Sequence, residues 1–195
     1  MKKTPPIMSF RNPIITQSLV NSVIEQSSSR MYGIHGLTHW MRVERNGHYL
    51  AEHNAADRDV ISLFALFHDA RRVNDNCDPG HGKRGAELAK KLYKDGFLPI
   101  SAEQLSTLVT ACNYHTEQPF TEDPTIACCW DADRLDLPRV GIRTNPNRLN
   151  TEAAKQIAAS GDYTCLKNTA QGRRKYLDCQ KVKHESRPSG LFAYG

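Results

Sequence analysis

Apolar residues recur every three to four positions along most of this chain, which is the spacing of one face of an α-helix. In residues 56–69 they continue nearly all round the helix, so this segment is expected at the centre of the fold. Alternation of Val, Ile and Thr, which would indicate strands, is scarce. The pattern therefore predicts an all-α protein. Its other expected helices span residues 13–29, 39–51, 83–94, 101–112, 124–137 and 151–159.

Two of these helices carry recognisable start signals, and the pattern fades near the C-terminus. The sequence SAEQ at 101–104 has the form of a capping box, and Thr151 is expected to cap the short helix that follows it. The remainder is polar and irregular. We therefore expect one domain over residues 1–160, and a basic segment at 161–195 that is either a tail or an extension of that domain.

Composition places the chain among soluble globular proteins. Of its 195 residues, 39% are hydrophobic and 24% are charged, and no apolar run of about 18 residues predicts a membrane span. The N-terminus lacks the apolar stretch of a signal peptide. None of the six cysteines forms a C-x-x-C pair, and the adjacent Cys128 and Cys129 lie in the apolar context IACCW. Reduced, buried thiols and a cytoplasmic location are expected.

The formal net charge of +5 is concentrated at the C-terminal end. From Leu166 onward there are seven Lys or Arg and two acidic residues, which leaves 19 basic and 19 acidic residues before it. A basic tail attracts nucleic acid or phosphorylated ligands. A solvated surface is the simpler interpretation and is favoured.

Four side chains that suit a divalent ion lie on apolar helix faces or directly after one. His39 shares a face with Val43, while Asp133 has Trp130 at i−3 and Leu137 at i+4. A carboxylate on a buried face is costly unless it is paired or metal-bound, and His nitrogen and carboxylate oxygen both ligate hard or borderline ions. The four candidate ligands are His39, His68, Asp69 and Asp133.

In this order the four residues resemble the H…HD…D signature of the HD-domain metal-dependent phosphohydrolases. The segment HGLTHWMRV resembles the first-ligand segment of that family, LFALFHDARR its central helix, and DADRLDLPRVG its last-ligand helix. The resemblance covers about residues 31–143. It implies a single helical HD domain that binds a divalent ion, which could be Mn²⁺, Fe²⁺, Ni²⁺, Co²⁺, Zn²⁺ or Mg²⁺, and it gives Asp69 a second role in orienting water.

Two further histidines lie in segments that also resemble this family. These are His81 in DPGHGKRGAELAKKL and His115 in ACNYHTEQP. In two-metal members, histidines at comparable places bind a second ion, but those members carry an adjacent histidine pair where this chain has Tyr114-His115. One ion is therefore favoured. His81 and His115 are expected to contact substrate phosphate or transfer a proton, and a second ion is the alternative.

Basic residues near the candidate ligands are expected to bind substrate phosphate. Arg71, Arg72 and Lys83 are favoured, because they follow the His-Asp pair or His81 in the sequence, and the arginine fork suits phosphate. Arg134 is explained equally well by a structural ion pair with acidic neighbours.

The remaining histidines and one further aspartate are expected outside the ligand set. His35 is separated from His39 by a glycine, so a loop hydrogen bond is favoured over metal ligation. Asp131 lies about 200° around the helix from Asp133, which predicts a surface carboxylate or one that supports the site. The histidines expected at the surface are His48, His53 and His184.

Three functions are consistent with these residues. The favoured hypothesis is a phosphohydrolase that uses metal-activated water on a nucleotide or another small phosphate ester. A two-metal phosphodiesterase or nuclease would use His81 and His115 as ligands, and the basic tail would suit it. A non-catalytic module that binds a nucleotide in the same pocket is the third hypothesis.

Overall fold

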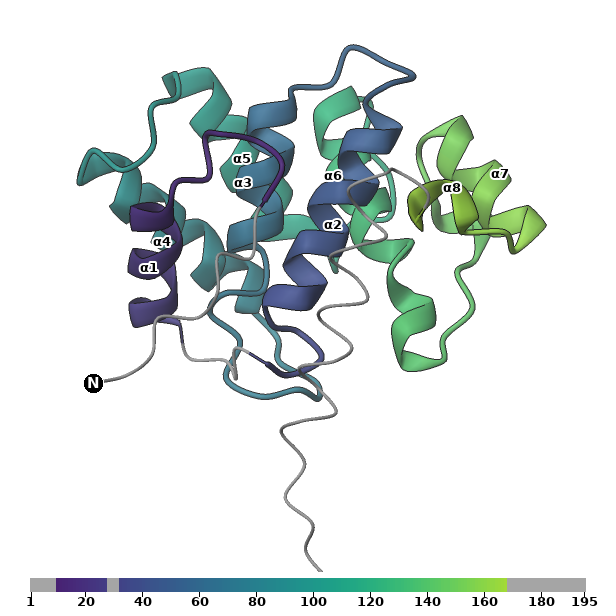
Figure 1. Ribbon diagram of the computed structural model, residues 1–195, viewed down its shortest axis with the longest axis horizontal. Coiled ribbons are helices and arrows are strands. Elements are labelled where there is room, and N and C mark those ends of the chain that lie inside the picture. The colour runs from purple at the N-terminus through teal and green to yellow at the C-terminus, as the bar shows by residue number, and fades with distance from the viewer. Residues whose placement is uncertain (1–9, 28–31, 168–195) are drawn as a thin grey trace, which may run out of the picture. The chain divides into compact units, whose positions relative to one another are not determined.

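A computed structural model of the protein describes residues 10–27 and 32–167, and they contain helices but no strand. The all-α prediction is therefore confirmed for this part of the chain (Figure 1). The chain divides into two compact units, Met1–Gly161 and Asp162–Gly195. The α-helices of the first unit are α1 (Gln17–Gln26), α2 (Leu37–Leu50), α3 (Arg58–Phe67), α4 (His81–Lys94), α5 (Ala102–Tyr114), α6 (Pro124–Arg134) and α7 (Glu152–Ser160), with short 3₁₀ helices η1 (Leu137–Val140) and η2 (Pro146–Arg148).

Of the second unit, the structure describes only residues 162–167, which include α8 (Thr164–Lys167). Most of the basic segment predicted at 161–195 thus lies outside the described residues. Within those residues, no helix combines the length and apolar character that crossing a membrane requires.

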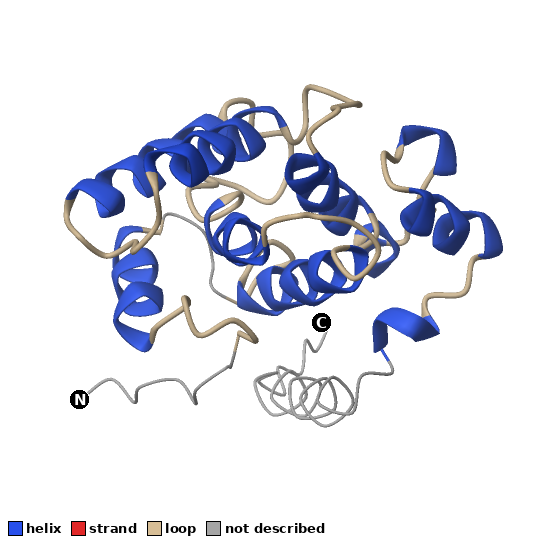
Figure 2. Ribbon diagram, turned by 90° about the horizontal axis from the view of Figure 1, so that it is seen from above, coloured by secondary structure: helices blue, strands red, loops and turns tan. Residues whose placement is uncertain are grey.

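Helix α3 is the centre of the first unit, as the apolar pattern predicts. Every side chain from Val60 to Phe67 is buried. Helices α2, α4, α5 and α6 all contact α3, and α2 also contacts α6. Figure 2 shows the helices of the described residues and the loops that join them. A helix that is apolar all round needs neighbours on every side, so its sequence determines its central position.

The predicted start signals are present, while several helix ends differ from expectation. Ser101 and Gln104 form the capping box of α5, and Thr151 accepts a hydrogen bond from Ala154 N at the start of α7. Helix α6 ends at Arg134 rather than at 137, and a 3₁₀ turn containing Pro138 follows it. Pro138 has no N–H to donate to the carbonyl oxygen of Arg134, four residues earlier, and its ring would clash with that carbonyl, which explains the early end.

Glycines allow the helices to approach closely where they cross. A Cβ at Gly82 would lie 2.2 Å from the carbonyl oxygen of Cys112 on α5, and one at Gly85 would lie 2.3 Å from the carbonyl oxygen of Phe67 on α3. Both distances are far below van der Waals contact, so any side chain there would push α4 away from its neighbours.

The structure corrects two surface predictions. His48 is buried with 8% exposure, and its Nε2 lies 2.8 Å from the Ser62 hydroxyl, because α2 turns this side chain towards α3. Asp131 is fully buried, and its carboxylate accepts hydrogen bonds from the backbone N–H groups of Asn150 and Thr151 ahead of α7. His53 is exposed as predicted, and His184 lies outside the described residues.

The buried thiols agree with the cysteine prediction. Cys112, Cys128 and Cys129 are buried and form no disulfide. Burial raises the pKa of the Cys128 thiol to about 11, so this group stays protonated and unreactive at neutral pH.

Replacing Gly82 with alanine should destabilise the fold. The new methyl group would meet backbone, which cannot move without separating α4 from α5. We expect a loss of about 1–3 kcal/mol in the free energy of unfolding, measured in urea. Glu87→Ala, an exposed change on the same helix, should stay within about 0.5 kcal/mol. Equal stability of the two variants would contradict the close crossing.

His48 should make the fold sensitive to mild acid. Burial, assisted by the charge of Arg58, lowers its pKa from 6.5 to about 4. Between about pH 6.5 and about pH 4, His48 is protonated in the unfolded chain but not in the folded chain. The free energy of unfolding therefore falls as the pH drops through this range. Between these limits the wild type should lose at most about 3 kcal/mol more than His48→Gln, which keeps a nitrogen near Ser62 but does not titrate. Urea unfolding at both pH values measures this difference, and identical losses would contradict it.

Candidate metal centre

Helices α2, α3 and α6 bring the four predicted metal ligands together at one point. His39 lies in the first turn of α2, His68 and Asp69 directly follow α3, and Asp133 lies in the last turn of α6. His39 and His68 have no exposed surface, whereas the Asp133 side chain is 22% exposed. The group is therefore closed on the helix side and open to solvent beside Asp133.

The spacing of the donor atoms suits a divalent ion. His39 Nε2 lies 3.1 Å from His68 Nε2, 3.3 Å from Asp133 Oδ1 and 3.6 Å from Asp69 Oδ2. His68 Nε2 lies 3.7 Å from Asp69 Oδ2 and 3.8 Å from Asp133 Oδ1. Ligands at about 2.0–2.2 Å from a four-coordinate ion are separated from one another by roughly 3.3–3.6 Å. The donor atoms of His39, His68 and Asp133 therefore fit around one ion with small adjustments, and Asp69 Oδ2 lies close to both histidines.

The hydrogen bonds of the two imidazoles aim their lone pairs at this point. His39 Nδ1 lies 2.7 Å from the Asp136 carboxylate, and His68 Nδ1 lies 3.1 Å from the carbonyl oxygen of Phe64. Carboxylate and carbonyl oxygens only accept, so each Nδ1 carries the proton and each neutral ring has its lone pair on Nε2. Two such lone pairs 3.1 Å apart repel unless a cation or a proton lies between them.

Asp136 and Arg42 fix the His39 ring, and the sequence analysis missed this role of Asp136. The Arg42 guanidinium binds Asp136 in a bidentate pair, with Nε at 2.6 Å and Nη2 at 2.9 Å. Asp136 thus accepts from His39 and Arg42 together. The available signal was its place three residues after Asp133, about one turn further along the chain. Partners of this kind set the tautomer and basicity of a ligand histidine.

A second group forms around the other oxygen of Asp69. His81 Nε2 lies 2.9 Å from His115 Nε2, and Asp69 Oδ1 lies 3.2 Å from the first and 3.9 Å from the second. The Nδ1 atoms of these rings donate to the carbonyl oxygens of Asp78 and Cys112, at 2.7 and 2.8 Å. Both Nε2 lone pairs again converge, so this group also has the donor chemistry of a cation site.

Close helix packing creates this second pair. His81 is the first residue of α4 and follows Gly80, whose positive φ of 79° turns the chain into the helix. His115 follows the last residue of α5. A Cβ at Gly82 would lie 3.0 Å from the His115 ring, so the same glycine that brings the helices together makes room for this imidazole.

Buried negative charge makes the site suited to cations. Burial opposes ionisation of Asp69 and Asp133, but the nearby histidines outweigh it and hold the pKa of each carboxyl below its usual range. Burial also opposes protonation of His39, yet the nearby Asp133 and Asp136 carboxylates raise its pKa. Burial lowers the pKa of His68 to about 3. The carboxylates are therefore ionised, and any positive charge bound here stabilises them.

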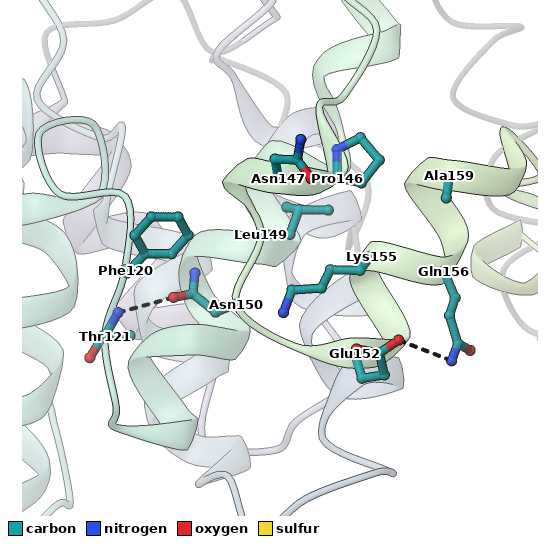
Figure 3. Close-up of a pocket in the computed structure, with 10 residues that line it drawn as sticks. All are labelled: Phe120, Thr121, Pro146, Asn147, Leu149, Asn150, Glu152, Lys155, Gln156 and Ala159. Carbon is teal, nitrogen blue, oxygen red and sulfur yellow. Dashed lines mark hydrogen bonds between the residues drawn. The ribbon is translucent and has the colours of Figure 1, made fainter.

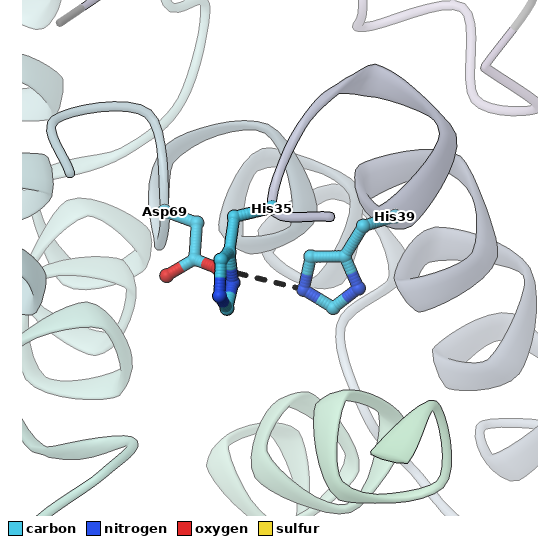
Figure 4. Close-up of side chains that lie close together, drawn as sticks. All are labelled: His35, His39 and Asp69. Atoms are coloured by element: carbon cyan, nitrogen blue, oxygen red, sulfur yellow. Dashed lines mark hydrogen bonds and ion pairs between the residues drawn. The ribbon is translucent and has the colours of Figure 1, made fainter. Parts of the chain in front are cut away.

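His35 joins the first group from the loop ahead of α2. Its Nδ1 lies 2.8 Å from Asp69 Oδ2, so the expected loop hydrogen bond is confirmed (Figure 4). The figure shows the His35 ring beside Asp69 and facing His39. Together these three residues bring donor atoms within 4.8 Å of one another.

Of the predicted phosphate-binding residues, one contacts the second group and the other two do not. Arg72 is buried, and its Nη1 lies 3.4 and 3.2 Å from the two ring nitrogens of His81, which places the guanidinium over the ring face rather than in its plane. Arg71 donates to the backbone carbonyl of Gln26, and Lys83 is exposed. Among the described residues, no contact joins Arg71 or Lys83 to the two groups.

Two other arginines differ from the sequence expectation. Arg134 forms no ion pair with a described residue, and instead donates to four backbone carbonyls, including those of Pro119 and Arg148. Arg139, which the sequence analysis missed, lies beside the first group, with Nε 3.4 Å from Asp136 Oδ2 and Nη2 3.5 Å from His35 Nδ1. It is a cation at the open side of the group.

A separate cavity of about 560 Å³ contains none of the predicted site residues (Figure 3). Phe120, Leu149 and Lys155 are among its lining residues. Arg134 and Asp131 tie its walls to α6 through the hydrogen bonds described above. These two residues therefore support the loops rather than the candidate ligands.

Residues 36–155 match the HD domain family, and the chain belongs to this family. The HD domain places it in a superfamily of metal-dependent phosphohydrolases, whose domains bind divalent metal ions. Comparisons with curated proteins and with solved structures found no significant match.

Replacing Asp136 with alanine should weaken metal binding without removing a candidate ligand. His39 would lose the partner that fixes its tautomer, and we expect about 10–100-fold lower affinity for Mn²⁺. Calorimetric titration of chelator-treated protein measures this. Asp95→Ala, an exposed change at the end of α4, is the matched control and should bind as the wild type does. Unchanged affinity in Asp136→Ala would contradict the role assigned to this carboxylate.

Proposed function

We propose that this protein hydrolyses small phosphate esters, nucleotides among them, with two divalent ions held on opposite sides of the Asp69 carboxylate. One observation carries the proposal. Asp69 Oδ2 faces His39 and His68, Asp69 Oδ1 faces His81 and His115, and the Nε2 lone pairs of each pair converge. A carboxylate shared between two such sets would serve as a ligand to both ions of a two-metal site.

The sequence pattern favours one ion, because the second segment lacks an adjacent histidine pair. The packing of α4 against α5 supports the second ion, since it pairs His81 with His115 from separate helices. When bound, ions in such sites lower the pKa of water and polarise phosphoryl oxygens.

The residues of the chain would then have separate roles. Asp136 and the backbone carbonyls hold the imidazoles in the tautomer that leaves Nε2 free. The open side lies beside Asp133, at 22% exposure, and His35, at 16%. A phosphate that approaches from there would meet the Arg139 guanidinium, which contacts His35 and Asp136 and whose fork suits phosphate oxygens.

Phosphodiesters are the second candidate substrate, and the paired histidines His81 and His115 favour them. Two ions can stabilise both the attacking and the leaving oxygen of a displacement at phosphorus. The basic segment that would assist nucleic-acid binding lies almost entirely outside the described residues.

Asp69→Asn should abolish hydrolysis, because an amide cannot supply two anionic oxygens to two ions. We expect more than about 100-fold lower kcat/KM with Mn²⁺, since even support residues of metal sites contribute about 10–100-fold. The assay uses p-nitrophenyl phosphate, bis(p-nitrophenyl) phosphate and a panel of nucleoside phosphates.

The panel also separates the alternatives. Turnover of the monoester alone supports a phosphomonoesterase, whereas turnover of the diester supports the second candidate. Asp95→Asn should retain full activity. Full activity of Asp69→Asn would contradict the mechanism, and nucleotide-induced thermal stabilisation without any turnover would indicate a binding module instead.

A further inference from the structure

We infer that His35 is a positioning residue that fixes the orientation of the shared Asp69 carboxylate, so that each oxygen stays with its own histidine pair. The inference rests on the proposed function, because a carboxylate that binds two ions must keep a fixed orientation. His35 acts on the ions only through Asp69.

The hydrogen bond from His35 is the shortest contact of the Asp69 side chain. Its Nδ1 lies 2.8 Å from Oδ2, whereas the nitrogens of His39 and His68 lie 3.6 and 3.7 Å from the same oxygen. On the other oxygen, the nearest nitrogen is that of His81, at 3.2 Å. His35 therefore makes the closest hydrogen bond to the carboxylate, and the nitrogens of the candidate ligand histidines lie further from it.

The chemistry of this bond distinguishes His35 from the four converging histidines. The Asp69 carboxylate is ionised and only accepts, so His35 Nδ1 must be the donor. The difference lies in the acceptor. His35 Nδ1 donates to Asp69 itself, whereas the Nδ1 atoms of the two pairs donate to Asp136 or to a backbone carbonyl oxygen.

The loop is built to hold His35 in place. Gly36 N donates to the carbonyl oxygen of Gly33 at 3.1 Å, which closes a turn with His35 inside it. Arg139 Nε donates to the carbonyl oxygen of Ile34 at 3.1 Å and ties the turn to η1. Helix α2 begins at Leu37, so the chain reverses at once and both His35 and His39 reach Asp69.

A second donor supports the far end of the carboxylate. Arg72 Nη1 lies 3.5 Å from Oδ1, while its Nε and Nη2 are occupied by the carbonyl oxygens of Asn74 and Asn76. A carboxylate offers about four lone-pair positions. One donor at each end orients the group and leaves a lone pair on each oxygen for an ion.

Three variants of His35 test the inference. His35→Asn can place its amide nitrogen where Nδ1 lies and so keep the donor to Asp69. His35→Gln has a longer side chain, and its amide nitrogen reaches the position of Nε2 instead. His35→Ala removes both nitrogens. Because this residue lies in a partly exposed loop, circular dichroism and thermal unfolding of the metal-free proteins first establish that all three variants fold.

The measurement is the affinity of the full, chelator-treated chain for Mn²⁺, followed by calorimetry. We expect His35→Ala and His35→Gln to bind about 10–100-fold more weakly than the wild type, and His35→Asn to restore most of this loss. A merely structural loop residue would instead lower the unfolding temperature of the metal-free protein without selective rescue by asparagine.

Each other outcome overturns a different statement. If wild type and His35→Ala bind Mn²⁺ equally, His35 does not position Asp69, while the proposed function stands. If His35→Asn binds as weakly as His35→Ala, the ring itself is needed and the positioning role is wrong. If the wild type binds no Mn²⁺, the proposed function and this inference both fail.

Discussion

The buried Asp69 carboxylate is the group on which the rest of this site depends. An ionised carboxylate with 3% exposure is stable only where positive charge and hydrogen-bond donors surround it. Helix α3 places it in the middle of the fold, where nitrogens of five histidines and of Arg72 surround it. The consequence is one carboxylate shared by two histidine pairs, and the proposal of two cations rests on this arrangement.

The scaffold keeps this point rigid through backbone as much as through side chains. Glycines at the helix crossings bring α4 against α3 and α5, and backbone carbonyls at helix ends accept the Nδ1 protons of three imidazoles. These bonds need no further residue, so the fold itself sets the tautomers. Only His39, at the start of α2, needs a side-chain partner, and Asp136 supplies it.

Sequence reasoning identified the fold class and the residues that converge, because both leave periodic or ordered signals. Apolar periodicity located the central helix, and candidate ligands on apolar faces drew attention to His39 and Asp133. The positions of the residues that were predicted wrongly depend on tertiary contacts. The burial of His48 and Asp131 depends on partners about 14 and 19 positions away, and the carbonyl contacts of Arg134 depend on loop paths that no periodicity encodes.

The most direct test of the account is the number and coupling of Mn²⁺ ions bound by the full chain, measured by elemental analysis and electron paramagnetic resonance after free metal is removed. Two ions per chain with the spectrum of an exchange-coupled pair are predicted, because one carboxylate bridges them. One ion per chain, or two ions with uncoupled spectra, would contradict the shared role of Asp69.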